Sequence, residues 1–265
     1  MLLALDVGNT ETKLGYFENG NQRLAHMWRV TTDLRRTADE YGVFFTQLFA
    51  ASDLSVKDID AVVIASVVPK LDRTLEAASE RFFNVAPMFL QPHWQQLIPV
   101  RTDRPAELGA DLIAAAIGGR ALHGAPLIIV SYGTATVFMA ISSQGEYLGT
   151  AIAPGINISI DALIGRTAKL PQVSLEAPHR AIGTTTVESL QAGIIYGFVG
   201  QTEALITRMR HELGSDACVV ATGGLADVFA RHSALIDEVD PHLSLIGLQL
   251  FHEWVVNGST ERDLR

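Results

Sequence analysis

The first ten residues hold a short polar turn that could grip a phosphate group. The apolar run Leu2–Leu5 ends at Asp6-Val7-Gly8-Asn9-Thr10, and a second apolar run follows at Leu14–Phe17. A hairpin between these runs would surround a phosphate with backbone N–H groups and a hydroxyl, while Asp6 could hold Mg²⁺ directly or through water. The same pattern also fits an ordinary β-turn with a capping aspartate.

A second turn of the same kind lies in the other half of the chain. The apolar run Leu127–Val130 meets Ser131-Tyr132-Gly133-Thr134-Ala135-Thr136, and a further run follows at Val137–Ile141. A pattern of strand, polar turn and strand that occurs once in each half of the chain indicates two structurally related halves. We therefore expect two hairpins that close around the phosphates of one nucleotide, which is a more specific pattern than either turn alone.

Asp111 is the candidate for acid–base chemistry. Gly109-Ala110-Asp111 opens an alanine-rich pattern that predicts a helix to about residue 122. A carboxylate in a first helical turn can simply complement the helix dipole, which is worth about 0.3–1 kcal/mol. It can equally be a carboxylate on a rigid element that accepts a proton from a hydroxyl.

Two further segments combine hydroxyls or glycines with a helix. Thr184-Thr185-Thr186 precede a long helix expected over 187–209, where they are either N-caps, in a capping box with Glu188, or ligand-binding hydroxyls. Glycines at 193, 197 and 200 suggest that this helix packs closely against a neighbouring helix or a second subunit. Gly223-Gly224, after a strand at 217–222, would let the backbone approach a flat ring such as adenine.

The elements that must position these residues alternate between strand and helix. Strands are expected at 23–30, 60–68 and 87–90, with a turn at Asn19-Gly20. Helices are expected at 34–48, capped within Thr31–Asp33, at 71–83, at 159–167 and at 249–257. Residues 92–105 read as a loop. The alternation predicts an α/β fold with mixed or largely parallel sheets and helices on their faces.

Composition limits the class of protein. The 265 residues carry a formal net charge of −9, which argues against a nucleic-acid-binding surface. One cysteine rules out an internal disulfide and a cysteine-based zinc site. No run of 18 apolar residues predicts a membrane span, and no basic segment followed by a cleavage site opens the chain. We expect a cytoplasmic protein that binds neither nucleic acid nor membrane.

The ordered motifs resemble the actin/Hsp70/sugar-kinase ATPase superfamily, and the whole chain resembles the type III pantothenate kinases. Beyond the two hairpins and the glycine pair, the matching segments are Thr37-Ala38-Asp39-Glu40-Tyr41, Ala65-Ser66-Val67-Val68-Pro69, Gly109-Ala110-Asp111, Ile152-Ala153-Pro154-Gly155-Ile156 and Gln191-Ala192-Gly193-Ile194-Ile195-Tyr196-Gly197. The resemblance implies two tandem ribonuclease H-like half-domains, at 1–115 and 116–265. It also implies ATP-dependent phosphorylation of pantothenate to 4'-phosphopantothenate, the first step of coenzyme A biosynthesis.

The resemblance also implies roles for individual residues. Asp111 would take the proton from the primary hydroxyl of pantothenate, and Mg²⁺ would lie near Asp6. Residues that would bind ATP are Asp6, Val7, Gly8, Asn9, Thr10, Glu11, Thr12, Lys13 and Thr134; residues that would hold pantothenate are Gly109, Ala110, Asp111, Leu112 and Thr186. Members of the family are dimers whose pantothenate pocket is completed across the subunit interface.

This chain departs from the family pattern at three places. Leu112 stands where the family has an arginine, and Ser131 replaces the aspartate of a site for a monovalent cation, K⁺ or NH₄⁺. Thr102-Asp103-Arg104-Pro105 replaces Tyr-Asp-Asn-Pro. Arg101 or Arg104 could take the place of the lost arginine. Potassium dependence is therefore open, and so are two other functions: a regulatory or interaction protein, or a kinase for another small hydroxylated acceptor.

Overall fold

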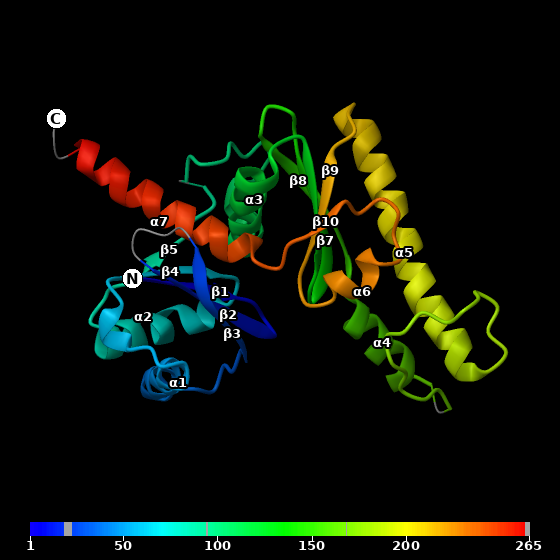
Figure 1. The fold of residues 1–265 in the computed structure, drawn as a ribbon, viewed down its shortest axis with the longest axis horizontal. Coiled ribbons are helices and arrows are strands. Elements are labelled where there is room, and N and C mark those ends of the chain that lie inside the picture. The colour runs from blue at the N-terminus through cyan, green and yellow to red at the C-terminus, as the bar shows by residue number, and fades with distance from the viewer. Residues whose placement is uncertain (19–22, 94, 168, 263–265) are drawn as a thin grey trace. The chain divides into compact units, whose positions relative to one another are not determined.

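The computed structural model describes residues 1–18, 23–93, 95–167 and 169–262, with the backbone alone for 259–262. The turn predicted at Asn19-Gly20 lies outside the described residues. By its contacts the chain divides into two compact units, shown together in Figure 1. The first holds residues 1–98, 103–118 and 243–265, and the second holds 99–102 and 119–242.

The first unit is built on a five-stranded sheet with the order β3-β2-β1-β4-β5. β1 pairs antiparallel with β2 and parallel with β4, β2 pairs antiparallel with β3, and β4 pairs parallel with β5. The strands are β1 (Leu2–Val7), β2 (Glu11–Phe17), β3 (Leu24–Thr31), β4 (Ala61–Ser66) and β5 (Met88–Phe89).

The second unit repeats this arrangement strand for strand. Its order is β8-β7-β6-β9-β10, with β6 antiparallel to β7 and parallel to β9, β7 antiparallel to β8, and β9 parallel to β10. The strands are β6 (Leu127–Tyr132), β7 (Ala135–Ile141), β8 (Tyr147–Pro154), β9 (Cys218–Thr222) and β10 (Glu238–Val239). The predicted α/β class with two related halves of mixed sheet is confirmed; the boundary between residues 115 and 116 stays a prediction.

The first sheet is covered by helices on both faces. Alternate β1 residues Leu3, Leu5 and Val7 pack into a buried apolar cluster with α1 (Ala38–Ala50) and α2 (Pro69–Phe83). α7 (Leu243–Arg262) lies on the other face (Figure 1). A Cβ at Gly15 of β2 would lie 3.1 Å from Leu245 Cδ1 of this helix. Because side chains alternate along a strand, Asp6 points toward the face that α7 covers.

Helices in the second unit pack against its own sheet. α4 (Ile156–Gly165), the long α5 (Thr186–Leu213) and α6 (Ala226–Ala230) share a buried cluster with β6 and β9. α3 (Ala110–His123) carries Asp111 in its first turn, within the first unit. Two short 3₁₀ turns, η1 (Val56–Asp58) and η2 (Pro105–Glu107), complete the elements. In the described part of the chain, every helix is too short or too polar to cross a membrane.

Two predicted helix starts were wrong. α1 begins after Thr37, because Thr37 and Glu40 form a reciprocal capping box, whereas the Asp33 carboxylate is bound to Arg35. α7 begins at Leu243, ahead of the predicted residue 249, since its first turns already bury leucine side chains. β8 and β10 were not predicted as strands; β8 is rich in small residues, and β10 has only two residues.

Candidate active site

Asp6 lies at the end of β1 with two partners on one carboxylate oxygen. The β1–β2 register sets Asp6 directly opposite Lys13, whose Nζ is 3.9 Å from Oδ2. The Ser244 hydroxyl of α7 donates to the same oxygen at 2.6 Å. Asp6 is only 9% exposed, and such partners offset the desolvation penalty of a buried carboxylate. Among the described residues, Oδ1 accepts no hydrogen bond, so this oxygen remains able to bind a metal or its water.

The first hairpin is closed by its own backbone. The N–H of Gly8 donates to the carbonyl of Glu11 at 3.0 Å, and a Cβ at position 8 would lie 2.9 Å from that carbonyl oxygen. Glycine is therefore the residue that this turn accommodates without displacement of its backbone.

Thr32, at the end of β3, clasps the same hairpin and was not recognised from the sequence. Its hydroxyl donates to the Gly8 carbonyl at 2.7 Å, and its N–H donates to the Thr10 carbonyl at 3.0 Å. Because that donation uses the single hydroxyl proton of Thr32, the 2.8 Å contact with Thr12 has the Thr12 hydroxyl as donor. No signal in the local sequence pairs Thr32 with the hairpin.

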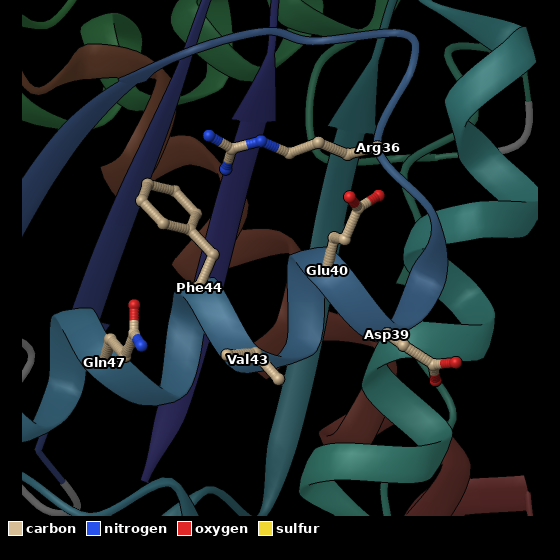
Figure 2. Close-up of a pocket in the computed structure, with 6 residues that line it drawn as sticks. All are labelled: Arg36, Asp39, Glu40, Val43, Phe44 and Gln47. Atoms are coloured by element: carbon tan, nitrogen blue, oxygen red, sulfur yellow. The ribbon is translucent and has the colours of Figure 1, made fainter.

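The start of α1 steadies this clasp. The Tyr41 hydroxyl donates to the Asp33 carbonyl at 3.0 Å and accepts from the Asp33 N–H at 3.2 Å. Beside it, an open hollow of about 430 Å³ lies along α1, where the Arg36 guanidinium covers the Phe44 ring at 4.2 Å (Figure 2). The hollow is lined by Arg36, Asp39, Glu40, Val43, Phe44 and Gln47. None of these residues belongs to the predicted site.

Asp111 has the properties of a general base. The pKa of its carboxyl is raised from 3.8 to about 6, chiefly by burial and next by the negative charge of Asp6. The N–H of Leu112 donates to Oδ1 at 2.8 Å, and this bond, with the charge of Lys13, opposes the rise in pKa. A base with a pKa near the working pH combines availability with proton affinity. Asp6 and Asp111 are thus electrically coupled within the first unit.

Gly109 makes room for the Asp111 carboxylate. A Cβ on Gly109 would lie 2.4 Å from Asp111 Oδ1 and 3.3 Å from Val67 Cγ1. No carboxylate oxygen can stay that close to a carbon, so any side chain at 109 must displace it. The glycine therefore limits where the Asp111 carboxylate can lie.

We expect Gly109→Ala to lower turnover about 10- to 100-fold while the free energy of unfolding changes by less than about 1 kcal/mol. The methyl group moves a flexible carboxylate rather than a packed backbone, so misplacement of the base outweighs any loss of stability. Steady-state kinetics and thermal unfolding measure the two effects. Gly258→Ala is the matched control, because a Cβ there meets nothing within 4 Å; equal kinetics for both variants would contradict the assignment.

The second hairpin mirrors the first within its own unit. The Gly133 N–H donates to the Ala135 carbonyl at 3.1 Å, and a Cβ at Gly155 would lie 2.1 Å from the Thr134 carbonyl oxygen. Thr136 is 1% exposed, and its hydroxyl has no hydrogen-bond partner among the described residues. A buried hydroxyl without a partner is costly unless a ligand satisfies it. Gly223, with φ of 94°, packs against the Tyr132 backbone beside this hairpin.

Several predicted site residues have other neighbours. The Val7 side chain lies in the core, and Glu11 accepts from Arg29 at 2.8 Å across the sheet. Thr185 is the N-cap of α5 and forms a capping box with Glu188, and Thr186 is exposed in the first turn. Ser131 lies within β6, opposite Val137. Asn9 and Thr10 are exposed at the tip of the first hairpin, and Ala110 is buried as the first residue of α3.

The two arginines considered as replacements are paired with carboxylates. Arg101 Nη2 lies 2.6 Å from a Glu146 oxygen, and Arg104 Nη1 lies 2.9 Å from a Glu107 oxygen. Both arginines keep more than half of their side chains exposed, at 60% and 76%. Such surface pairs are weak, so either arginine can exchange its partner for an anionic ligand at little cost.

The donor set suits a phosphate–magnesium ligand. No group of three metal-ligating side chains occurs in the described ranges. Mg²⁺ commonly binds through one or two carboxylates together with substrate phosphates and water, which a single Asp6 can satisfy. Backbone N–H groups and hydroxyls of a hairpin supply phosphate contacts. The residues therefore fit ATP with a divalent metal.

Comparison with known proteins agrees with this chemistry. The family model described as type III pantothenate kinase matches residues 2–208. A type III pantothenate kinase of Myxococcus xanthus (strain DK1622) is 48% identical over 252 residues, covering 95% of this chain and 98% of that protein. One of Moorella thermoacetica (strain ATCC 39073 / JCM 9320) is 49% identical over 253 residues, covering 96% and 99%.

A solved structure adds support for the fold alone. The activator of the 2-hydroxyisocaproyl-CoA dehydratase from Clostridium difficile, with bound ADPNP, superimposes with a TM-score of 0.54 at 13% identity, covering 99% of this chain and 96% of that one. The sequence matches go further, because they span nearly the whole chain at close to half identity. The chain belongs to the type III pantothenate kinase family.

Proposed function

We propose that the chain transfers the γ-phosphoryl group of ATP to the primary hydroxyl of pantothenate, with Asp111 as the base. Family membership supports the reaction, and the observation that carries the mechanism is the Asp111 carboxyl itself. It stands in the first turn of α3 with a pKa raised by burial to about 6, coupled to the Asp6 charge. This function accounts for both carboxylates.

Asp111 accepts the hydroxyl proton as the oxygen of pantothenate attacks phosphorus. The new O–P bond forms as the bond to the leaving oxygen breaks, and ADP departs with that electron pair. Phosphoryl transfer depends chiefly on positioning and charge stabilisation, so the rigid start of α3 and the short β1–β2 hairpin are suitable supports. The Leu112 N–H keeps the carboxylate in one orientation.

The nucleotide is held by the first hairpin. Gly8 forms the tight turn, Asn9 and Thr10 offer N–H groups and a hydroxyl at its tip, and Lys13 adds a positive charge beside Asp6. In the second unit, Thr134 and the buried Thr136 hydroxyl of the second hairpin are the groups that we propose for nucleotide binding. Bound Mg²⁺, near Asp6, would neutralise phosphate charge and orient the transferring group.

We assign the binding of pantothenate to Gly109, Ala110, Leu112 and Thr186. The Leu112 N–H donates to Asp111, and the Leu112 side chain has no charged group that could bind the carboxylate of pantothenate. We therefore propose Arg101 or Arg104 as the donor to that carboxylate. Ser131 has only a hydroxyl to offer a cation, and dependence on K⁺ or NH₄⁺ is therefore weak or absent. The cytoplasmic location stays a prediction.

One assay tests this function against the alternatives. Purified protein with ATP and Mg²⁺ is expected to release ADP only when pantothenate is added, and 4'-phosphopantothenate should appear in equal amount. Nucleotide binding without turnover of any acceptor would favour a regulatory protein. Turnover with another small alcohol but not with pantothenate would favour a different kinase.

We also propose a homodimer formed through the second unit. Several apolar side chains there are exposed, among them Ile152 at 67% and Ile182 at 81%. The α5 glycines 193, 197 and 200 share one helical face, and a Cβ at any of them would meet nothing within 4 Å. Exposed apolar side chains and an open glycine face in the same unit suit close packing of a second copy.

We expect Gly197→Glu to convert the dimer to a monomer and to raise the KM for pantothenate about tenfold, because it places a charge on that face. Nucleotide affinity should stay within about twofold, since the nucleotide residues lie elsewhere. Sedimentation velocity and steady-state kinetics measure both effects. Gly258→Glu, at another open helical glycine, is the control; a Gly197→Glu protein that still dimerises would exclude this face.

A further inference from the structure

We propose that Ser244 is a positioning residue that fixes the Asp6 carboxylate, so that the first turns of α7 are part of the kinase site. This inference rests on the proposed role of Asp6. Ser244 donates its hydroxyl to Asp6 Oδ2 at 2.6 Å, from the other end of the chain. Both side chains are buried, with Ser244 at 6% exposed and Asp6 at 9%.

Each side chain of this pair needs the other. A buried hydroxyl without an acceptor and a buried carboxylate without donors both carry large desolvation penalties. Lys13 Nζ, at 3.9 Å, is too far from Oδ2 for a hydrogen bond, so Ser244 is the close donor to this oxygen. With Oδ2 held, Oδ1 keeps a fixed direction, which is the requirement for binding a metal or its water.

α7 also contacts the helix that carries the base. A Cβ at Gly247 would lie 1.8 Å from the Ala114 carbonyl oxygen, and a Cβ at Gly118 would lie 2.1 Å from the Leu243 carbonyl oxygen. The backbones of α7 and α3 therefore touch on both sides of Ser244. One helix braces Asp6 through a hydroxyl and the helix of Asp111 through glycine contacts.

A double-mutant cycle with Asp6→Asn tests whether Ser244 acts through Asp6. Ser244→Ala is expected to raise the KM for MgATP about tenfold, the effect of losing one hydrogen bond to a charged group, and to leave the KM for pantothenate within about twofold. In the Asp6→Asn background, Ser244→Ala should raise the KM for MgATP by less than about twofold, because the side chain that Ser244 positions has already lost its charge.

Ser79→Ala is the matched control. Ser79 is 2% exposed and donates one 2.6 Å hydrogen bond, to the Val85 carbonyl, so its loss should lower stability without changing the KM for MgATP. Ser244→Cys has a side chain of similar size but a weaker donor, so its KM for MgATP should lie between those of the wild type and Ser244→Ala. It provides a second measurement if the alanine variant is poorly folded.

The possible outcomes separate the two ideas. The positioning role would be overturned if Ser244→Ala raised the KM for MgATP equally with aspartate and with asparagine at position 6. It would also be overturned if Ser244→Ala had wild-type kinetics while Asp6→Asn was impaired. If Asp6→Asn itself turned over MgATP normally, the proposed role of Asp6 would fail, and the inference about Ser244 would fail with it.

Discussion

Asp111→Asn should turn over pantothenate about 10²–10⁴-fold more slowly than the wild type, with MgATP affinity nearly unchanged. Asparagine keeps the size of the side chain and an oxygen that can accept the Leu112 N–H, but it cannot take a proton from the acceptor hydroxyl. The loss should therefore appear in kcat rather than in nucleotide binding. Steady-state kinetics with a separate nucleotide titration measure the two quantities.

The pH dependence should distinguish this base from a merely structural carboxylate. Below its pKa of about 6, Asp111 is protonated and cannot act as a base, so wild-type kcat should fall as the pH drops through about 6. This fall in kcat at low pH, the acidic limb of the pH profile, should be absent from the small residual activity of Asp111→Asn. Wild-type turnover by the variant, or an unchanged acidic limb, would remove Asp111 from the mechanism.

The same raised pKa predicts that Asp111 costs stability. The folded state, with a pKa of about 6, binds more protons than the unfolded state, with a pKa near 3.8. The contribution of Asp111 to the free energy of unfolding therefore falls as the pH rises from about 3.8 to about 6. Above that range the protein is destabilised by the full amount. Asp111→Asn should consequently be more stable at pH 8, by about 2 kcal/mol after allowance for its partial exposure. At pH 4 the difference should shrink toward zero.

Local signals in the sequence were sufficient to predict the two hairpins and the start of the helix that carries Asp111. Apolar runs that stop at Gly8 and at Gly133 predict strands joined by tight turns, and both turns are present. Gly109-Ala110-Asp111 precedes an alanine-rich stretch, and α3 begins within it. In each case residues close together in the chain determine the structure, because turns and helix ends are satisfied by their own neighbours.

Contacts between distant segments could not be predicted in the same way. Thr32 and Ser244 hold the hairpin and Asp6 from segments whose own patterns carry no chemical signal. The misplaced start of α7 hid Ser244, because the segment containing it was not expected to be helical. The pKa of Asp111 likewise depends on burial and on the charge of Asp6, neither of which its neighbours in the chain specify.

Asp6→Asn should reduce kcat/KM for MgATP by about a hundredfold or more, because the carboxylate that we propose as the metal ligand is replaced by a neutral amide. The amide oxygen can still accept from Ser244, so the loss should reflect charge rather than packing. Titration of activity with Mg²⁺ should show a higher half-saturating concentration. Asp39→Asn, at a surface pair with Arg81, is the control and should leave the kinetics unchanged.

The coupling between the two carboxylates makes this prediction sharper. The Asp6 charge raises the pKa of Asp111, so the Asp6→Asn variant should show its acidic limb at lower pH than the wild type. A change that merely loosened the fold would expose Asp111 to water and reduce the burial effect, but it would also lower the unfolding temperature. Asp6→Asn at wild-type stability with an unshifted acidic limb would mean that the two groups do not share one site. A downward shift at unchanged stability would link Asp6 and Asp111 through their charges.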